Sequence, residues 1–273
     1  MAVSELCGEI DAFFSKRSWG QSKCSELDWD VIGYSAQGRP LISYSQGDPK
    51  STAKTLLQCA IHGDELPTLA MCMKFIDELR GEGKRKLPSR SYVVVQPLLN
   101  PDGYFASKPT RQNARGVDLN RNFPTKDWGR RALQDWKRKY KSSPRKFPGH
   151  KPATEPETLA IMKNIQEMKP QKLISIHTPL GHLDLDSHGD KDQKRRAQYL
   201  AINMSKNSGD YKFIHFGYYP GSLGNYAGKE RAIPVYTLEL PPGNTIEDYW
   251  KRFRLSLWRA VEFDLSTGRF IED

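Results

Sequence analysis

The sequence predicts an α/β fold in which a mixed β-sheet is flanked by helices on both faces. Short apolar runs rich in β-branched residues alternate along the chain with longer segments whose apolar residues recur at helical spacing. Such runs are typical of strands buried on both faces, and helices are the elements that cover those faces. The 273 residues are enough for one domain with a sizeable core. We therefore expect a single domain.

Residues 1–30 are expected to form a helical segment that caps the rest of the chain. A helix is predicted at Ser4–Phe14, and a polar connection follows it. The catalytic region is expected to span 31–273. It should begin with two strands, Val31–Ser35 and Leu41–Ser45, which alternate in polarity and are joined by a tight loop.

The elements that follow alternate between strand and helix. Buried strands are predicted at residues 56–61, 92–99, 173–177 and 235–240. Helices are predicted at residues 69–76, 154–165, 191–205 and 246–263. The stretch from 105 to 124 shows no clear periodicity, and long irregular loops inside compact domains are often functional. This loop is therefore a candidate for part of a site.

Two of the predicted strands end in residues that bind metals. His62 and Glu65 follow the first buried strand, and His177 ends the third. Ligand sites in open α/β sheets form at the carboxyl ends of strands. Two histidines and one glutamate, with a fourth position left for water, form the ligand set of a catalytic zinc ion. A histidine and a glutamate three residues apart also occur by chance, so the zinc prediction depends on His177.

The formal net charge of +10 predicts contact with an anionic partner or surface. Nine Lys or Arg and two Asp fall between Lys126 and Lys146, inside an expected insertion at about 126–150, and three aromatic residues lie among them. This pattern fits a solvated insertion, contact with anionic cell-wall polymer, or binding of single-stranded nucleic acid. We favour a solvated insertion over nucleic-acid binding.

The sequence gives mixed signals about the compartment. It has no apolar stretch of the ~20 residues that a membrane-spanning helix needs, and Met1–Glu5 lacks the basic and apolar blocks of a signal peptide. Cys7 and Cys24 lie in a polar segment, where either a disulfide or two free thiols fits the sequence. Cys59 and Cys72 lie in apolar elements and are expected to be small buried hydrophobic residues. Since a disulfide would indicate an oxidising compartment, we expect the periplasm, with the cytoplasm as the alternative.

Four motifs, in this order, resemble those of the zinc carboxypeptidases related to carboxypeptidase A. They are His62-Gly63-Asp64-Glu65, Asn100-Pro101-Asp102-Gly103, Asp118-Leu119-Asn120-Arg121-Asn122-Phe123 and Thr237-Leu238-Glu239-Leu240, with His177 between the last two. The resemblance covers about residues 31–250. It implies a carboxypeptidase-like sandwich that holds one Zn²⁺ per chain on His62, Glu65 and His177, the ligand types that carboxypeptidase A uses.

The same resemblance implies catalytic roles. Glu239 is expected to be the general base that takes a proton from zinc-bound water. Arg111 is expected to stabilise the negative charge that develops on the scissile carbonyl oxygen, and Arg115 is the alternative for this role. Asp64 is expected to orient a neighbouring group and not to bind zinc.

Substrate-binding roles follow in the same way. Asn120 and Arg121 are expected to grip the terminal carboxylate of the substrate, for which a planar guanidinium offers two parallel donors. Tyr218 and Tyr219 both lie near the place of the family's mobile tyrosine, and we favour Tyr219 as the substrate-binding residue.

The residues that would read a charged substrate side chain stay open. In some relatives one position confers a preference for basic side chains, and it falls near Gly224, so no acidic residue marks it. His182, Asp184 and Asp186 follow His177 closely and are candidates for this role. The other interpretation is that each is a polar loop residue.

Longer segments resemble one branch of the family, bacterial zinc peptidases that act on the cell wall. These segments are residues 111–124, 151–158, 220–222 and 239–242. They imply hydrolysis of the bond between γ-D-glutamate and meso-diaminopimelate in peptidoglycan peptides or muropeptides. The alternatives are a generic metallocarboxypeptidase, a deacylase of N-acyl amino acids, and a wall- or nucleic-acid-binding protein that has lost catalysis. The oligomeric state stays open.

Overall fold

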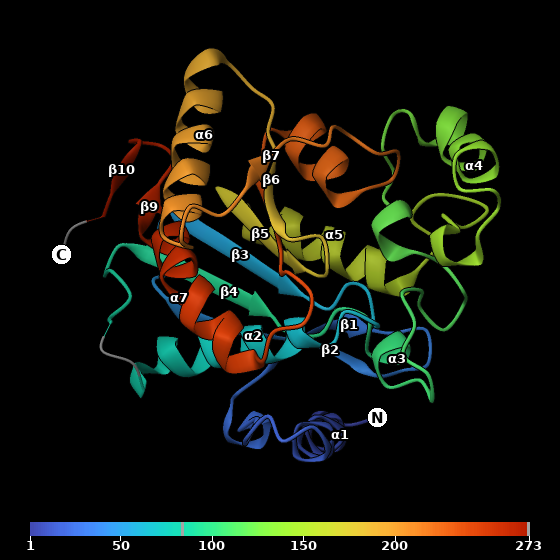
Figure 1. Cartoon of the computed structure of the whole chain (residues 1–273), viewed down its shortest axis with the longest axis horizontal. Helices are drawn as coiled ribbons and strands as arrows, with labels where there is room; N and C mark the ends of the chain where they lie inside the picture. Colours follow the sequence, from blue (N-terminus) through green and yellow to red (C-terminus); the bar gives the residue numbers. More distant parts are fainter. Residues whose placement is uncertain (83–84, 272–273) are drawn as a thin grey trace.

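The chain folds around one eight-stranded sheet, which runs through the middle of the molecule (Figure 1). This computed structural model describes residues 1–82 and 85–271, so residues 83–84 and 272–273 of the expected catalytic region lie outside the description. The strand order across the sheet is β1-β2-β4-β3-β5-β8-β6-β7. The strands are β1 (Asp30–Tyr34), β2 (Pro40–Gly47), β3 (Ala53–Cys59), β4 (Ser91–Gln96), β5 (Lys172–His177), β6 (His182–Asp186), β7 (Phe213–Ile214) and β8 (Val235–Glu239).

The four central strands, β4, β3, β5 and β8, run parallel to one another, and they are the four buried strands that the sequence predicts. Every residue of β5 is buried, as expected for a strand covered on both faces. The outer strands β1, β2 and β6 pair antiparallel with their inner neighbours, which makes the sheet mixed. Because the central strands share one direction, their carboxyl ends meet at one edge of the sheet.

Helices cover both faces of the sheet, so the predicted fold class is confirmed (Figure 1). The larger core lies under α2, α6 and α7, and a second core lies under α5 on the opposite face. Leu57 of β3 belongs to the first core and Leu56 to the second, since successive strand residues point to opposite faces. The helices are α1 (Val3–Lys16), α2 (Pro67–Asp77), α4 (Trp128–Arg138), α5 (Pro156–Met168), α6 (Lys191–Lys206) and α7 (Ile246–Glu262).

Shorter elements complete the chain. The short helical turns are η1 (Cys24–Glu26), η2 (Glu78–Glu82), α3 (Pro101–Tyr104), η3 (Leu119–Arg121), η4 (Pro144–Lys146) and η5 (Gly224–Lys229). A separate two-stranded sheet pairs β9 (Phe263–Asp264) with β10 (Arg269–Phe270). Among the helices of the described residues, none combines the length and the apolarity that crossing a bilayer requires.

The interpretation of His182, Asp184 and Asp186 as polar loop residues is wrong, because the chain from His182 to Asp186 forms strand β6. The two leucines of this strand belong to the larger core, while the three polar residues alternate with them and face a pocket on the other side. The alternation expected of a half-buried strand is therefore present, but it is only five residues long.

Two disulfides tie the structure together. Cys7 in α1 is bonded to Cys24 in η1, which settles the two alternatives for that pair. Cys59 and Cys72 are buried, as predicted, but they form a second disulfide that their interpretation as small hydrophobic residues did not include. Cys59 ends β3 and points into the larger core, where α2 brings Cys72 against it. The bond therefore clamps the first helix of the catalytic region to its central strand.

Replacing both Cys59 and Cys72 by alanine is expected to lower the free energy of unfolding by about 2–4 kcal/mol, because the cross-link restricts a 13-residue segment of the unfolded chain. Urea denaturation of the oxidised proteins measures the change. The matched control is the double alanine variant of Cys7 and Cys24, whose disulfide lies in the amino-terminal cap. Because this cap holds none of the metal donors, the control variant should keep the zinc content of the parent protein. Equal stability of the Cys59/Cys72 variant and the parent protein would contradict the expectation.

Candidate metal centre and active site

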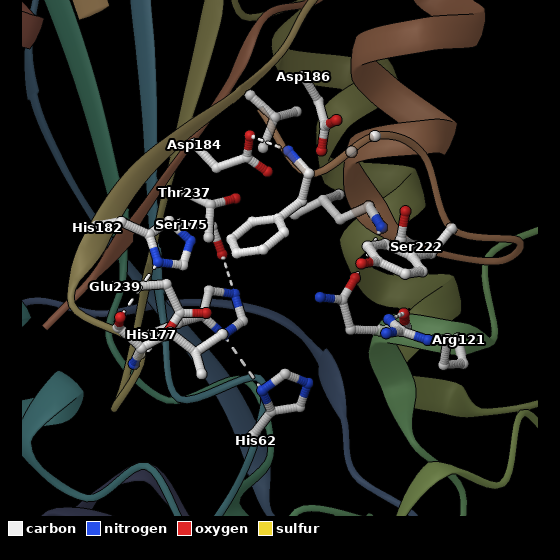
Figure 2. A pocket seen from close by; sticks show the side chains of 18 of the residues that line it. His62, Arg121, Ser175, His177, His182, Asp184, Asp186, Ser222, Thr237 and Glu239 are labelled. Atoms are coloured by element: carbon white, nitrogen blue, oxygen red, sulfur yellow. Dashed lines mark hydrogen bonds between the residues drawn. The ribbon is translucent and has the colours of Figure 1, made fainter. Parts of the chain in front are cut away.

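The three predicted metal ligands come together at the carboxyl edge of the sheet. His62 follows β3, Glu65 lies in the turn before α2, and His177 is the last residue of β5. Since β3 and β5 are neighbouring parallel strands, the two histidines leave the sheet side by side, and Figure 2 shows their rings facing each other. All three side chains are buried.

The turn that carries His62 and Glu65 is braced at both ends. The Ala60 N–H donates to the Thr68 hydroxyl at 3.1 Å, and this hydroxyl donates to the Glu65 carbonyl at 2.7 Å. A Cβ atom at Gly63 would overlap the backbone of Gly103 and of the residue after it. Glycine at position 63 therefore lets the loop after β3 touch the turn after β4, which is why the first two sequence motifs lie together.

The donor atoms have the spacing of ligands around a single ion. His62 Nδ1 lies 2.7 Å from Glu65 Oε1, His177 Nδ1 lies 2.9 Å from Glu65 Oε2, and the two nitrogens are 3.2 Å apart. Ligands held at ~2.0–2.1 Å around a tetrahedral zinc ion would be roughly 3.3 Å from one another. The two imidazole nitrogens and the carboxylate that face one another are also the ligand types that zinc prefers. The residues therefore fit a zinc ion.

Charge in this cluster is balanced by a second, deeper carboxylate. Asp118 Oδ2 accepts from Arg111 Nε at 2.8 Å, and Asp118 Oδ1 lies 3.3 Å from His62 Nε2. Burial disfavours a charged Asp118, but Arg111 and His62 outweigh it and hold the pKa of this carboxyl well below its ordinary value. Asp118 thus fixes the ring of a metal ligand and the guanidinium beside it.

Arg111, and not Arg115, lies at the metal centre. Its Nη1 is 3.1 Å from His62 Nδ1 and 3.6 Å from Glu65 Oε1, and the side chain is buried. Arg115 is 56% exposed and lies away from the pocket, where it contacts Glu155 at 3.9 Å. Of the two arginines considered from the sequence, only Arg111 can reach a group bound at the metal.

Glu239 is placed beside His177 by the register of the sheet. Glu239 is the last residue of β8. It pairs directly with His177 of β5 on one side and with His182 of β6 on the other. Its side chain is 9% exposed and reaches the pocket, and the Leu180 N–H donates to its Oε2 at 3.3 Å. A carboxylate is thus held next to the metal donors and open to a bound molecule (Figure 2).

The site opens into a pocket of about 270 Å³. Asn120 and Arg121 of η3 form one wall, and the Asn120 Oδ1 accepts the Leu223 N–H at 2.8 Å. Arg121 donates to the Asn120 carbonyl through Nη1 at 2.6 Å, while its buried Nε has no hydrogen-bond partner among the described residues. Because Arg121 also lines the pocket, its guanidinium is suited to an anionic group there.

The structure separates the two tyrosines. The ring of Tyr219 lines the pocket, with its centroid 4.9 Å from the Arg121 guanidinium carbon. The Tyr218 hydroxyl donates to the Ser187 carbonyl at 2.8 Å, outside the pocket lining. Tyr219 is therefore the tyrosine that can touch a bound molecule.

The basic insertion is not simply solvated, because it packs on the site. It contains α4, whose Trp128 is buried, and its Arg145 forms an ion pair with Asp64 in the metal-binding turn. Lys146 and Tyr140 line the pocket. Burial, together with the positive charges of neighbouring arginines, lowers the pKa of Lys146 to about 8.

Some functional contacts had little signal in the sequence. Asp118 is marked only by its place in the motif that contains Asn120 and Arg121, and its contact with His62 could not be inferred from spacing. Ser175, whose hydroxyl lies 2.9 Å from His177 Nε2, is a common strand residue. In a run of nine cations, nothing distinguishes Lys146 as the one that faces the pocket.

Fold and site together define a hydrolase that uses a metal ion held at the edge of an α/β sheet, with a free carboxylate beside it. Residues 21–244 match the zinc carboxypeptidase family, peptidase M14, and the chain belongs to that family. The cofactor is zinc, and His62, Glu65 and His177 are a group of three buried residues that could hold one such ion.

Two relatives are bacterial enzymes named murein peptide amidase A. The enzyme of Vibrio campbellii is 31% identical over 212 residues, which is 77% of this chain and 78% of that protein. The enzyme of Escherichia coli K12 is 30% identical over 216 residues, or 77% of this chain and 80% of that protein. These similarities confirm the predicted resemblance to the branch of the family that contains the murein peptide amidases.

Solved structures agree with the fold. The murein-tripeptide amidase of Escherichia coli O157 matches with a TM-score of 0.58 and 25% identity, over 85% of this chain and 89% of that one. The carboxypeptidase A of Helicoverpa armigera matches with a TM-score of 0.68 and 20% identity, over 88% of this chain and 67% of that one. The second match shows the shared fold only.

Proposed function

We propose that this zinc hydrolase cuts the bond between γ-D-glutamate and meso-diaminopimelate in peptidoglycan peptides. One observation carries the proposal: the metal donors and Glu239 share a pocket with Asn120 and Arg121, and the guanidinium of Arg121 is a group suited to a carboxylate. The murein peptide amidases similar to this chain act, by their names, on such peptides. Diaminopimelate at the end of a peptide offers the free carboxylate.

The proposed reaction is a hydrolysis in which Glu239 moves the proton. Zinc, when bound, polarises a carbonyl and lowers the pKa of water, so that a nucleophile exists at neutral pH. Glu239 accepts a proton from the attacking water and passes it to the amine of diaminopimelate as the amide bond breaks. The carboxylate is suited to both steps because the sheet register fixes it beside His177.

Arg111 is proposed to stabilise the negative charge that develops on the carbonyl oxygen. Its guanidinium is buried and held by Asp118, so little reorganisation is needed when the charge forms. Asn120 and Arg121, which line the pocket, are proposed to bind the terminal carboxylate. Tyr219 is proposed to cover this carboxylate from the pocket wall.

The decisive experiment is mass spectrometry of L-Ala-γ-D-Glu-meso-diaminopimelate after incubation with the zinc-loaded protein. Free diaminopimelate and L-Ala-D-Glu are expected in equal amounts. An N-blocked α-linked dipeptide and an N-acetyl amino acid are incubated in parallel. Cleavage of only the dipeptide would favour a generic carboxypeptidase, and cleavage of only the N-acetyl amino acid would favour a deacylase. No cleavage of any of them would favour a binding protein without catalysis.

The exposed cations of the insertion are proposed to hold the enzyme on anionic peptidoglycan. Changing Arg130, Lys137 and Arg138 of α4 to glutamine removes three exposed charges and should weaken sacculus binding about tenfold at low salt, at ~0.5 kcal/mol per cation. Salt should abolish the difference. Binding is measured by co-sedimentation.

The matched control for that experiment removes the same charge elsewhere. Lys163, Lys169 and Lys206 are exposed and lie on α5, just after it, and on α6. Their change to glutamine should alter binding by less than about twofold, since each exposed charge acts over only a Debye length of ~10 Å. Equal losses in both triple variants would show that net charge and not the insertion decides binding.

We propose that the protein works in the periplasm. Two disulfides among four cysteines support an oxidising compartment such as the periplasm, since cytosolic proteins rarely keep disulfides. Alkylation of intact cells followed by mass spectrometry of the protein should find no modified cysteine. Four alkylated thiols would instead place the protein in the cytoplasm.

A further inference from the structure

The basic insertion places one cation, Lys146, in the wall of the active-site pocket. The short turn η4, which Lys146 ends, is held on both sides. Arg145 forms its ion pair with Asp64 in the metal-binding turn, and the Asp118 N–H donates to the Phe147 carbonyl at 2.8 Å. The Lys146 side chain is half-buried and lines the pocket that holds the metal donors. It is therefore fixed where a bound molecule can reach it.

Aromatic contacts inside the insertion support this placement. Trp136 of α4 donates through Nε1 to the Ser143 carbonyl at 2.8 Å, and its ring packs on Phe147 with the centroids 4.9 Å apart. The Tyr140 ring lies beside the ammonium group of Lys146, with 5.3 Å between its centroid and Nζ. The aromatic residues among the cations thus shape the loop that carries Lys146.

The ammonium group of Lys146 forms no ion pair with an acid among the described residues. Burial, and then the positive charges of Arg111 and Arg121, lower its pKa to about 8. Asp118 also acts on it, but this carboxylate already accepts from Arg111 Nε at 2.8 Å. A half-buried cation that has other cations as neighbours and no acid of its own is stabilised by an anion that enters with a ligand.

The neighbours of Lys146 indicate which part of the substrate it meets. In the proposed reaction, Arg111 faces the scissile carbonyl oxygen and Arg121 faces the terminal carboxylate. Lys146 lines the same pocket and feels both charges, so its ammonium group stands beside the scissile bond. A glutamate linked through its γ-carboxyl keeps its α-carboxylate free, a short aliphatic chain away from the scissile carbonyl. A residue linked through its α-carboxyl has no such group.

We infer that Lys146 binds the free α-carboxylate of the γ-linked glutamate and thereby makes the enzyme select γ-glutamyl substrates. The inference rests on the proposed function, because it needs the γ-linked bond to lie between Arg111 and Arg121. The insertion then has two separate tasks. The exposed cations of α4 meet the wall polymer, and Lys146 meets the peptide that is cut.

The test compares L-Ala-γ-D-Glu-meso-diaminopimelate with its γ-D-isoglutamine counterpart, in which the α-carboxylate is replaced by a carboxamide. The zinc-loaded parent protein should favour the glutamate compound in kcat/KM by at least about fivefold, since the amide cannot form the charge-assisted hydrogen bond. Lys146→Met should lower kcat/KM for the glutamate compound by about 5- to 50-fold, mainly through KM, because the contact is made alike in the bound substrate and in the transition state. The isoglutamine compound should change by less than about threefold.

Two further variants control for charge and for position. Lys146→Arg keeps a cation that can pair with a carboxylate and should keep at least about half of the preference. Lys141→Met removes a cation from the same insertion, but Lys141 is exposed and lies outside the pocket lining. It should change the glutamate-to-isoglutamine ratio by less than about twofold, since solvent and salt screen an exposed charge. Zinc content and melting temperature show whether each variant is folded. Equal loss of the ratio in Lys141→Met and Lys146→Met, or no loss in Lys146→Met, would overturn the assignment.

The same measurements separate the α-carboxylate from the other carboxylates of the substrate. If Lys146 bound the terminal carboxylate, Lys146→Met would lower kcat/KM for both compounds equally. If it bound the far carboxylate of diaminopimelate, the effect of Lys146→Met would vanish when L-lysine, which lacks that group, takes the place of diaminopimelate. Either result would overturn the assignment.

Failure of the inference and failure of the proposed function give different results. Turnover of both compounds at equal kcat/KM would overturn the inference and leave the proposed bond standing. Turnover of neither would overturn the proposed bond. In that case calorimetric titration of the zinc-loaded protein with the two intact compounds carries the comparison. A lower Kd for the glutamate compound that Lys146→Met removes would support the assignment, and equal Kd values or no binding would overturn it.

Discussion

Replacing Glu239 by glutamine is expected to lower kcat by about 10²- to 10⁴-fold, because an amide cannot accept the proton that the carboxylate takes from water. Glutamine keeps the shape of glutamate and the backbone pairing of β8 with its two neighbouring strands. Zinc content should therefore stay at one ion per chain. Diaminopimelate release is followed by mass spectrometry under single-turnover conditions.

The control for this variant is Glu239→Asp, which keeps a carboxylate but withdraws it by one methylene group. Its kcat should lie between those of the parent protein and Glu239→Gln, because a base remains but is farther from the reacting water. If Glu239→Gln kept more than a tenth of the parent kcat, another residue would have to be the base.

Replacing His177 by alanine is expected to abolish both zinc binding and hydrolysis, because only two of the three donors remain. Metal analysis by mass spectrometry should give close to zero zinc, where the parent protein holds one ion. The parent should also gain unfolding free energy on zinc addition, about 4 kcal/mol when free zinc is about 1,000 times Kd, and the variant should gain none.

His182→Ala is the matched control for the metal experiment. His182 also pairs with Glu239 in the sheet and lines the pocket, but it lies outside the donor cluster. The variant should bind zinc as the parent protein does. Zinc retained at one ion per chain in His177→Ala would disprove the ligand set.

The centre of the fold and the metal donors could be predicted because burial leaves a simple pattern. β3 and β5 are buried on both faces, so each reads as an apolar run, and the first polar residue after the run marks the strand's end. His177 is the last residue of β5, and His62 lies in the turn just after β3. Their closeness then follows from parallel pairing alone, without knowledge of any side-chain contact.

The second disulfide could not be predicted because burial alone explains Cys59 and Cys72. Each lies in an apolar element, and the bond depends on the angle at which α2 crosses β3, which no local pattern encodes. Strand β6 could not be predicted from the sequence for a different reason. Five residues with three polar side chains look like a loop, and the strand becomes evident only when β8 is there to pair with it.

The insertion shows how charge patterns can mislead. A run of basic residues is usually an exposed face, and most cations of α4 are exposed. The contacts that matter are Arg145 with Asp64 and Lys146 with the pocket, and both depend on where the segment folds back. Such long-range placement is absent from composition and periodicity.

The pairing of His177 with Glu239 has a consequence for how this enzyme can change. Two paired positions on adjacent strands are ~4.8 Å apart, and slipping the register by one residue would turn every side chain of the strand to the opposite face. The backbone pairing of β5 with β8 thus sets the distance between His177 and Glu239. The walls of the pocket come from β6, η3, η5 and the insertion. A redesign of substrate choice can be confined to those walls, with the hydrolytic chemistry left intact.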